Sequence, residues 1–251
     1  MAHGAEPAGS LEVRAKGSLP LQYMETVSRS GHRDSTSYAP FLDLSATAQL
    51  QQDLKASAFV NGGHNELGGF SEGDNTLMSS GVSVERKFGA LSIGTSAEHT
   101  HYYTGTFERT ANIANDLNVF AKYSWTPNPS LKIHPSLTIS TRFGDDLTMQ
   151  RTSYSFRVSV EQWLFDKWCF VASTRIRYAD YTGIEAGRRD TSLGVSAGLK
   201  YAINQSVGVT MLAAVDDRTS NVASRRSDRF AVGASLDFDI DFARPRWPGE
   251  R

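Results

Sequence analysis

Charged side chains in this chain recur two residues apart, within stretches that otherwise alternate apolar and small polar residues. Arg175 and Arg177 have this spacing, and Asp237, Asp239 and Asp241 repeat it near the end of the sequence. Side chains two residues apart lie on the same face of a strand, so each set predicts a row of like charge. Fixed charges beside water attract or repel ions, which predicts electrostatic selection of small solutes.

A second group of residues has the types needed for nucleophilic catalysis. Ser80, His99 and Asn115 would meet on one outward face if the segments that contain them pair as neighbouring strands, and such a set could act as nucleophile, base and orienting group. A weaker inward set consists of His134, Ser136 and Glu161, for which no oxyanion site can be named. Histidines that only hydrogen-bond lipid headgroups and water explain the same residues, and we expect no enzyme.

Metal, phosphate and disulfide chemistry find little support. His99 and His101 share one face, but no carboxylate accompanies them there. The glycine-rich segment 62–73 lacks the spacing and the lysine of a phosphate loop. The single cysteine, Cys169, excludes an intramolecular disulfide and a cysteine-based zinc site. The sequence therefore predicts no metal and no cofactor.

The elements that must position the charged rows are strands. Residues 230–242 alternate almost without error, with Phe230, Phe238 and Phe242 on one face and the three aspartates on the other. A period of two excludes a helix. Thirteen residues exceed the usual soluble strand of about 5–6 residues, and suit a tilted strand that crosses a bilayer, which needs about 9–11 residues.

Similar alternation recurs along the chain and predicts an all-β protein. We expect a twelfth strand within residues 19–29, where Glu25 interrupts the apolar face, and an even number of strands leaves both termini on one side. The division predicted is a flexible N-terminal segment at 1–18, a barrel at 19–242 and a C-terminal tail at 243–251. The eleven clearer strands are residues 42–50, 54–61, 78–85, 91–98, 117–125, 131–143, 154–161, 170–178, 192–201, 207–216 and 230–242.

The connections alternate between short turns and longer polar loops. Short turns are predicted at 51–53, 86–89, 126–130, 165–167 and 203–206, and long loops at 62–75, 104–115, 144–151, 182–190 and 217–228. Aromatic residues fall near both sets of strand ends, as in the girdles of membrane barrels. This asymmetry favours a transmembrane antiparallel up-and-down β-barrel over a soluble β-sandwich, the alternative that the alternation leaves open.

Composition is compatible with a barrel wall. Mean hydropathy is −0.36 and no run approaches the length of a membrane helix. A formal charge of −1 gives no sign of a nucleic-acid partner. No leader is visible at the start of the chain, so an exported protein requires that a signal peptide has been removed.

With these features the chain resembles the outer-membrane β-barrels of Gram-negative bacteria and is loosely similar to β-barrel porins. A last strand that ends on an aromatic residue, here Phe242, looks like the signal read by barrel-assembly machinery, although nine residues follow it. The resemblance implies an outer-membrane location, contact with lipid and lipopolysaccharide, and passage of small solutes. Arg188-Arg189 and Arg225-Arg226 in two outer loops are candidates for lipopolysaccharide contact, or ordinary solvated loop charges.

The expected function is a porin-like channel for passive passage of small polar or anionic solutes, saccharides among them. Two alternatives remain: a non-conducting structural or accessory barrel, for example a partner in exopolysaccharide export, and an outer-membrane lipid hydrolase. Twelve strands lie between barrels filled by side chains and barrels with a wide channel, so an open and a plugged lumen are both allowed. We predict a basic sector and an acidic sector among the pore-lining residues Arg142, Arg157, Arg175, Arg177, Lys122, Lys132, Glu161, Asp216, Asp237, Asp239 and Asp241.

Overall fold

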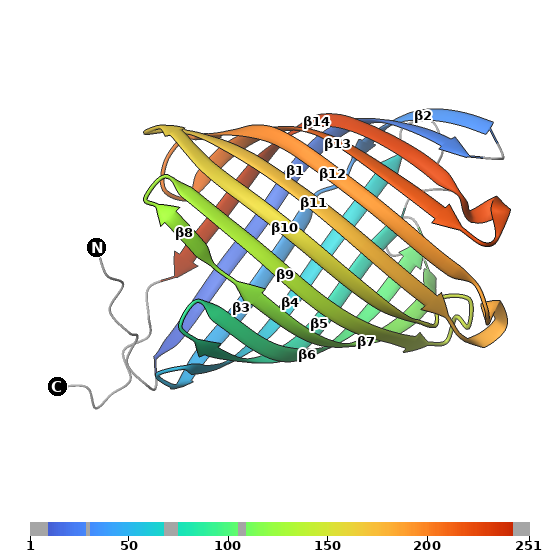
Figure 1. Cartoon of the computed structure of the whole chain (residues 1–251), viewed down its shortest axis with the longest axis horizontal. Helices are drawn as coiled ribbons and strands as arrows, with labels where there is room; N and C mark the ends of the chain where they lie inside the picture. Colours follow the sequence, from blue (N-terminus) through green and yellow to red (C-terminus); the bar gives the residue numbers. More distant parts are fainter. Residues whose placement is uncertain (1–9, 29–30, 68–74, 105–108, 243–251) are drawn as a thin grey trace.

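The computed structural model describes residues 10–28, 31–67, 75–104 and 109–242, which are almost entirely antiparallel strands (Figure 1). Within these ranges no helix is long and apolar enough to cross a membrane. The strands are β1 (Leu11–Ser28), β2 (Gly31–Tyr38), β3 (Phe41–Gln51), β4 (Leu54–Leu67), β5 (Asn75–Phe88), β6 (Leu91–Thr104), β7 (Arg109–Tyr123), β8 (Trp125–Asn128), β9 (Leu131–Gly144), β10 (Arg151–Phe165), β11 (Trp168–Tyr181), β12 (Arg189–Ala202), β13 (Val207–Ser220) and β14 (Ser227–Phe242).

The sheet closes on itself to form a barrel. β14 pairs with β1, with Val13 opposite Phe242 at one end of the ladder. β2 and β3 occupy one position in the wall, between β1 and β4, and β7 and β8 both pair with β9. The fourteen segments therefore occupy twelve strand positions around the barrel, which confirms the predicted twelve-stranded antiparallel barrel.

The first strand begins earlier than predicted. β1 starts at Leu11, whereas residues 11–18 were expected in a flexible N-terminal segment. In the barrel, Arg14 and Lys16 instead lie opposite Asp241 and Asp239 of β14, on the inward face. The predicted tail at 243–251 and residues 1–9 lie outside the described residues.

β2 was not predicted, and several strands run further into the loop end than expected. β2 carries no apolar alternation, yet it pairs with the outer half of β1, and Figure 1 shows it at the rim. β4 continues to Leu67 and β7 starts at Arg109, within segments predicted as loops. Where strands project beyond a bilayer both faces meet water, so pairing continues although the apolar pattern stops.

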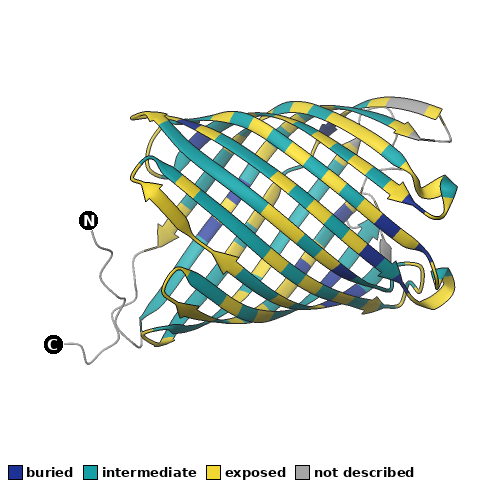
Figure 2. Ribbon diagram, viewed as in Figure 1, coloured by how far each residue is buried: buried dark blue, intermediate teal, exposed yellow. Residues whose placement is uncertain are grey.

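The two faces of the wall differ in the sense expected for a membrane barrel. Large apolar side chains such as Leu117, Val119 and Val195 are half exposed on the outer surface, at 50–55 %. The buried apolar residues among those described are few and mostly small, and Figure 2 shows exposed positions spread along all strands instead of a buried layer. A β-sandwich would bury these apolar side chains, so the soluble alternative does not fit.

Aromatic rings cover two glycines on the inward side of the β4–β7 wall. A Cβ built on Gly81 would lie only 2.4 Å from the ring of Phe59, and one on Gly94 only 2.5 Å from the ring of Phe120. The rings lie over the space that a side chain would otherwise fill, an arrangement that helps fix strand register. These two rings therefore fill part of the lumen beside the β4–β7 wall.

Candidate functional site

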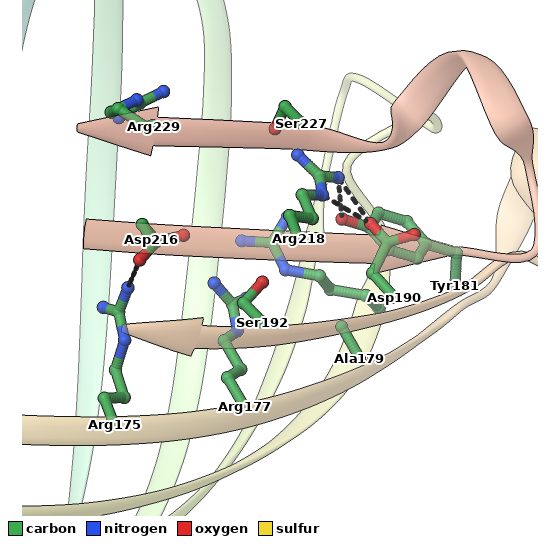
Figure 3. Close-up of a pocket in the computed structure, with 11 residues that line it drawn as sticks. Arg175, Arg177, Ala179, Tyr181, Asp190, Ser192, Asp216, Arg218, Ser227 and Arg229 are labelled. Atoms are coloured by element: carbon green, nitrogen blue, oxygen red, sulfur yellow. Dashed lines mark hydrogen bonds and ion pairs between the residues drawn. The ribbon is translucent and has the colours of Figure 1, made fainter. Parts of the chain in front are cut away.

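The inward faces of β9 to β14 carry a concentration of arginines in the half of the barrel nearest the long loops. A cavity of about 330 Å³ lies against β10 to β14 (Figure 3). Its charged lining consists of five arginines and two aspartates, a formal excess of three positive charges. These residues are Arg151, Arg175, Arg177, Arg218, Arg229, Asp190 and Asp216.

A second cavity of about 420 Å³ lies against β6, β7 and β9 to β11. It too is lined by five arginines against two acids, and it shares three of the arginines with the first cavity. The shared residues are Arg151, Arg175 and Arg177; Arg142 and Arg157 complete the basic set, opposed by Glu98 and Asp116. The shared arginines lie where the two cavities adjoin.

Arg142 is neutralised directly by its cross-strand neighbour Asp116. The Nε of Arg142 donates to Asp116 Oδ1 at 2.9 Å and its Nη2 donates to Oδ2 at 2.7 Å, while Nη1 donates to the hydroxyl of Tyr102 at 3.1 Å. The Asp116 side chain is 9 % exposed and that of Arg142 20 %. Both side chains of this ion pair are therefore largely shielded from water.

Arg175 reaches its partner across a glycine. Arg175, Gly194 and Asp216 stand side by side on β11, β12 and β13, and the Arg175 Nη2 donates to Asp216 Oδ2 at 3.1 Å. A Cβ on Gly194 would lie 2.9 Å from that oxygen, so the glycine leaves room for the pair. Asp216, predicted in the acidic sector, thus pairs directly with an arginine of the basic sector, because the small residue on β12 allows the two sectors to touch.

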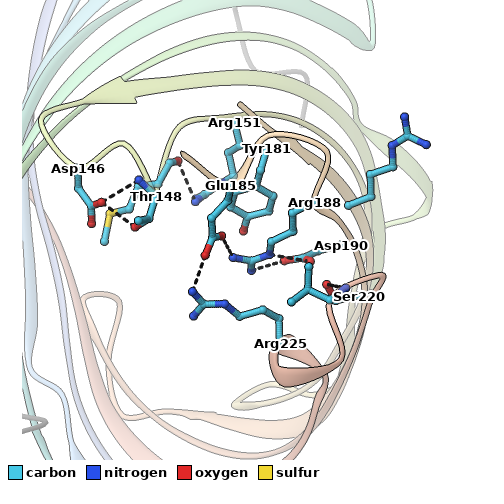
Figure 4. Close-up of polar contacts among 12 residues, drawn as sticks. Asp146, Thr148, Arg151, Tyr181, Glu185, Arg188, Asp190, Ser220 and Arg225 are labelled. Atoms are coloured by element: carbon cyan, nitrogen blue, oxygen red, sulfur yellow. Dashed lines mark hydrogen bonds and ion pairs between the residues drawn. The ribbon is translucent and has the colours of Figure 1, made fainter. Parts of the chain in front are cut away.

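Two loops are joined at the mouth by a network of arginines and acids (Figure 4). The 3₁₀ turn η2 (Gly183–Glu185) lies in the β11–β12 loop, and η3 (Ala223–Arg225) lies in the β13–β14 loop. Glu185 accepts a hydrogen bond from Arg188 and one from Arg225 at 2.5 Å. Desolvation opposes ionisation of Glu185, but these two hydrogen bonds prevail and lower its pKa below the ordinary value.

Arg188 is buried in this network, not displayed to solvent. Its side chain is 6 % exposed, its Nη2 donates to Asp190 at 2.6 Å, and its guanidinium lies 4.0 Å from the centre of the Tyr181 ring. Asp190 also accepts hydrogen bonds from Arg218. Desolvation by burial lowers the pKa of Arg188, but the hydrogen bonds to Asp190 and Glu185 have a larger opposite effect. The net result is a pKa above the ordinary value for arginine. Arg188 is therefore not an ordinary solvated loop charge, since its charge is satisfied inside the protein, and lipopolysaccharide contact by the loop arginines stays a prediction.

Four lumen arginines have no carboxylate partner among the residues that the structure describes: Arg151, Arg157, Arg177 and Arg229. The Nε of Arg151 is buried without any hydrogen-bond acceptor. The register also sets like charges directly opposite each other, Arg142 against Arg151 and Arg157 against Arg175. Like charges in such positions destabilise a sheet, so the arrangement works against stability.

At the short-turn end most inward charges are paired. Arg14 donates to Asp239 at 2.5 Å and lies 3.2 Å from Asp241. Asp237 accepts hydrogen bonds from Thr210 and Ser235. The predicted acidic sector is therefore largely neutralised, chiefly by β1, a strand whose lower half was expected to be a tail.

The remaining predicted lining residues lie on the same inward faces. Lys122 and Lys55 both form ion pairs with Glu85, at 3.6 and 3.2 Å. Lys132 stands opposite Glu161 on β10. Whether any of these residues lines a conducting path stays a prediction.

The candidate catalytic residues are brought together on the outer surface but are not connected as a triad. Ser80, His99 and Asn115 stand opposite one another on β5, β6 and β7. His99 Nδ1 is 2.8 Å from Asn115 Oδ1, but its Nε2 is 2.9 Å from Nε2 of His101 and makes no hydrogen bond to Ser80.

The inward candidates are not assembled either. His134 faces Ser159, while Glu161 faces Lys132. No group of three or more possible metal ligands occurs in the described ranges.

Sequence reasoning missed several residues of the charged cavities. Arg151, Arg218 and Arg229 each fall on the inward face if the predicted alternation is continued beyond the apolar part of its strand. Asp116 and Asp190 precede the predicted strand starts by one or two residues. The available signal was the unbroken period of two, extended past the membrane edge.

The closed barrel, its apolar outer face and its charged interior define a porin-like or channel-like barrel of the Gram-negative outer membrane. Residues 116–239, just under half of the chain, match the sequence profile of the family described as "Putative beta-barrel porin 2". No curated protein matches the chain.

Solved structures share the architecture at low sequence identity. An outer membrane channel from Pseudomonas putida F1 is 12 % identical, with a TM-score of 0.58 over 95 % of this chain and 98 % of that one. A bacterial polysaccharide outer membrane secretin is 11 % identical, with a TM-score of 0.51 over 94 % of this chain and 100 % of that one. Similarity at this level establishes the fold alone.

Proposed function

We propose that the barrel is a passive outer-membrane channel that favours small anionic solutes. The observation that carries the proposal is the set of four arginines without carboxylate partners, which face two cavities inside the barrel. Each cavity has an excess of three positive charges on its lining. The chain as a whole has a net formal charge of −1, so the positive excess is local to these cavities.

Unpaired guanidinium groups in a narrow polar tube act over the whole cross-section. The low-dielectric wall concentrates their field in the lumen, which raises the local concentration of anions and lowers that of cations. Ion selectivity in channels arises from such rings of fixed charge. Arginine is fully charged over the physiological range, so the preference does not depend on pH there.

The wall opposite the aromatic rings supports an aqueous path toward the short-turn end. A further cavity of about 210 Å³ lies along β1, β13 and β14. Its lining includes small residues such as Ala214, Ala231 and Gly233, which occupy little of the lumen and so support the proposed path.

Conductance in planar bilayers tests the proposal. The purified protein should give discrete current steps and, in a potassium chloride gradient, a reversal potential that shows preference for chloride. The double variant Arg157→Gln with Arg229→Gln removes one unpaired charge from each cavity and should lower the chloride-to-potassium permeability ratio by about a factor of two or more.

The matched control is Lys87→Gln, which removes one exposed positive charge at the short-turn rim. It should leave the permeability ratio unchanged. A protein that inserts as a folded barrel and gives no current steps would favour the non-conducting accessory barrel instead. The observation that favours such an accessory barrel is the contact of Glu185 with Arg225, which joins two loops at the mouth.

A further inference from the structure

We infer that the arginine-lined cavities form one extended binding site for a linear acidic oligosaccharide. The inference rests on the proposed function, because it names the solute class that the same lumen would pass. Its evidence is the placement of the unpaired arginines along the wall, which a single small anion cannot satisfy.

The unpaired arginines are divided between the two cavities. Arg157 lines the cavity on the β9 side and Arg229 lines the cavity on the β14 side, while Arg151 and Arg177 line both. A ligand that contacts Arg157 and Arg229 must therefore extend across the boundary between the cavities. Arg177, which lies between Arg157 and Arg151 along the strand direction, would contact the part of the ligand between them.

Strand register gives the spacing of these groups. Arg177 stands opposite Ser155 of β10, two residues from Arg157 and four residues from Arg151. At about 3.3 Å per residue these steps correspond to about 7 Å and about 13 Å along the strand. Charges at such intervals match acidic groups that recur along an extended chain, and not the clustered oxygens of one phosphate or one monosaccharide.

Without a bound anion, the arginines of this site repel one another, which costs electrostatic free energy. Arg151 has a buried Nε without an acceptor, and it stands directly opposite Arg142. Arg157 likewise stands opposite Arg175. A carboxylate bound between them would accept from the guanidinium groups in bidentate geometry and remove the repulsion.

The neutral part of the lining favours a saccharide over another polyanion. Between the arginines of the β9-side cavity lie rows of side-chain hydroxyls on β9 and β10: Ser136, Thr138, Ser140, Ser153 and Ser155. Hydroxyl groups both donate and accept hydrogen bonds, as sugar hydroxyls do. Hydroxyls interleaved with guanidinium groups suit a chain that alternates hydroxyls with carboxylates.

The test compares four probes: a linear hexauronate, glucuronate, maltohexaose and hexaglutamate. Each is titrated calorimetrically against the detergent-solubilised barrel, and each is added to planar bilayers to measure the concentration that halves the current. Hexauronate should bind at least tenfold more tightly than any of the other three. The calorimetric arm does not need conduction, so a non-conducting barrel that binds hexauronate would reject the proposed function and retain the site.

Variants locate the binding. Arg151→Gln and Arg177→Gln should each weaken hexauronate binding at least tenfold. Arg177→Lys should recover only part of the lost affinity, because lysine keeps the positive charge but cannot donate the two parallel hydrogen bonds of a guanidinium group. Lys87→Gln should leave the affinity unchanged. Neither glutamine variant should lower the thermal midpoint of the empty barrel, since each removes an uncompensated charge.

Three results would overturn the inference. Equal affinity for glucuronate and hexauronate would mean a site for a single anion. Equal affinity for hexaglutamate would remove the saccharide specificity. Unchanged hexauronate affinity in both glutamine variants would place the binding elsewhere.

Discussion

Replacing Asp116 by asparagine is expected to destabilise the folded barrel by about 3 kcal/mol, because it leaves a shielded guanidinium without its counter-charge. Asp116 accepts hydrogen bonds from both Nε and Nη2 of Arg142, and the two side chains are 9 % and 20 % exposed. In the variant, Arg142 would keep its bond to Tyr102 and one neutral amide oxygen as acceptor, but it would lose its counter-charge while facing Arg151 across the ladder. Loss of one partner from a buried pair typically costs about 3–5 kcal/mol, and the partial exposure of Arg142 places this pair at the lower end.

A matched pair in the same lumen provides the control. Asp216 accepts one hydrogen bond from Arg175, at 3.1 Å, and both side chains are 37 % exposed. Water screens a pair of this kind, so Asp216→Asn should cost about 1 kcal/mol or less. The comparison holds the chemistry constant and varies only shielding and the number of hydrogen bonds.

Urea unfolding of the barrel in lipid vesicles measures both losses. Double-mutant cycles with Arg142→Gln and Arg175→Gln isolate the pair energies, which should be about 2 kcal/mol or more for Arg142–Asp116 and below about 1 kcal/mol for Arg175–Asp216. Equal losses for the two asparagine variants, or a coupling energy near zero for Arg142–Asp116, would refute the reasoning. Such a result would mean that lumen water screens both pairs alike.

Two further predictions concern the wall and the mouth. Val195→Arg, at a lipid-facing position, should destabilise the barrel by about 2–4 kcal/mol in the same urea assay. Ser196→Arg, on the inward face, should fold with little loss of stability. Equal losses of stability in the two variants would contradict the assignment of the two faces. Because the pKa of Glu185 is lowered, its loop contact should persist at neutral pH and be lost only below the ordinary carboxyl range, about pH 4. The distance between spin labels at Ile184 and Val222 should lengthen on acidification, and Glu185→Gln should lengthen it already at neutral pH; a distance independent of both changes would count against the contact.

The strands were predictable because their signal is local. Residues 230–242 alternate between apolar and small or acidic residues, and the structure places them in β14, which starts only three residues earlier. The same held for the short turns at 51–53, 165–167 and 203–206, where the apolar pattern restarts after a few residues, whereas the predicted turn 126–130 is mostly occupied by β8, a strand that was not predicted. Each of these inferences needs only neighbouring residues in the sequence.

The errors lie in β2 and in the first eight residues of β1. β2 has polar residues on both faces, so its composition resembles that of a loop. The start of β1 does alternate, with Leu11, Val13 and Ala15 on the outward face, but this apolar face is short. What holds them in the sheet is pairing with partners distant in sequence, such as Arg14 with Asp239. Local alternation cannot show such a partner.

The charge pattern of the lumen depends on strand register, which is why a nearly neutral chain can contain a strongly basic site. The sequence has 26 basic and 27 acidic residues. Asp116 and Asp239 form ion pairs with Arg142 and Arg14, and Asp216 pairs with Arg175 while standing opposite Arg229. Arg151 and Arg177 form no ion pair with an acid among the described residues. A shift of any strand by two residues would keep every side chain on its face and still change which charges meet. The positive excess is therefore a property of the closed barrel. Variants that alter single ion pairs should change ion selectivity without changing the fold.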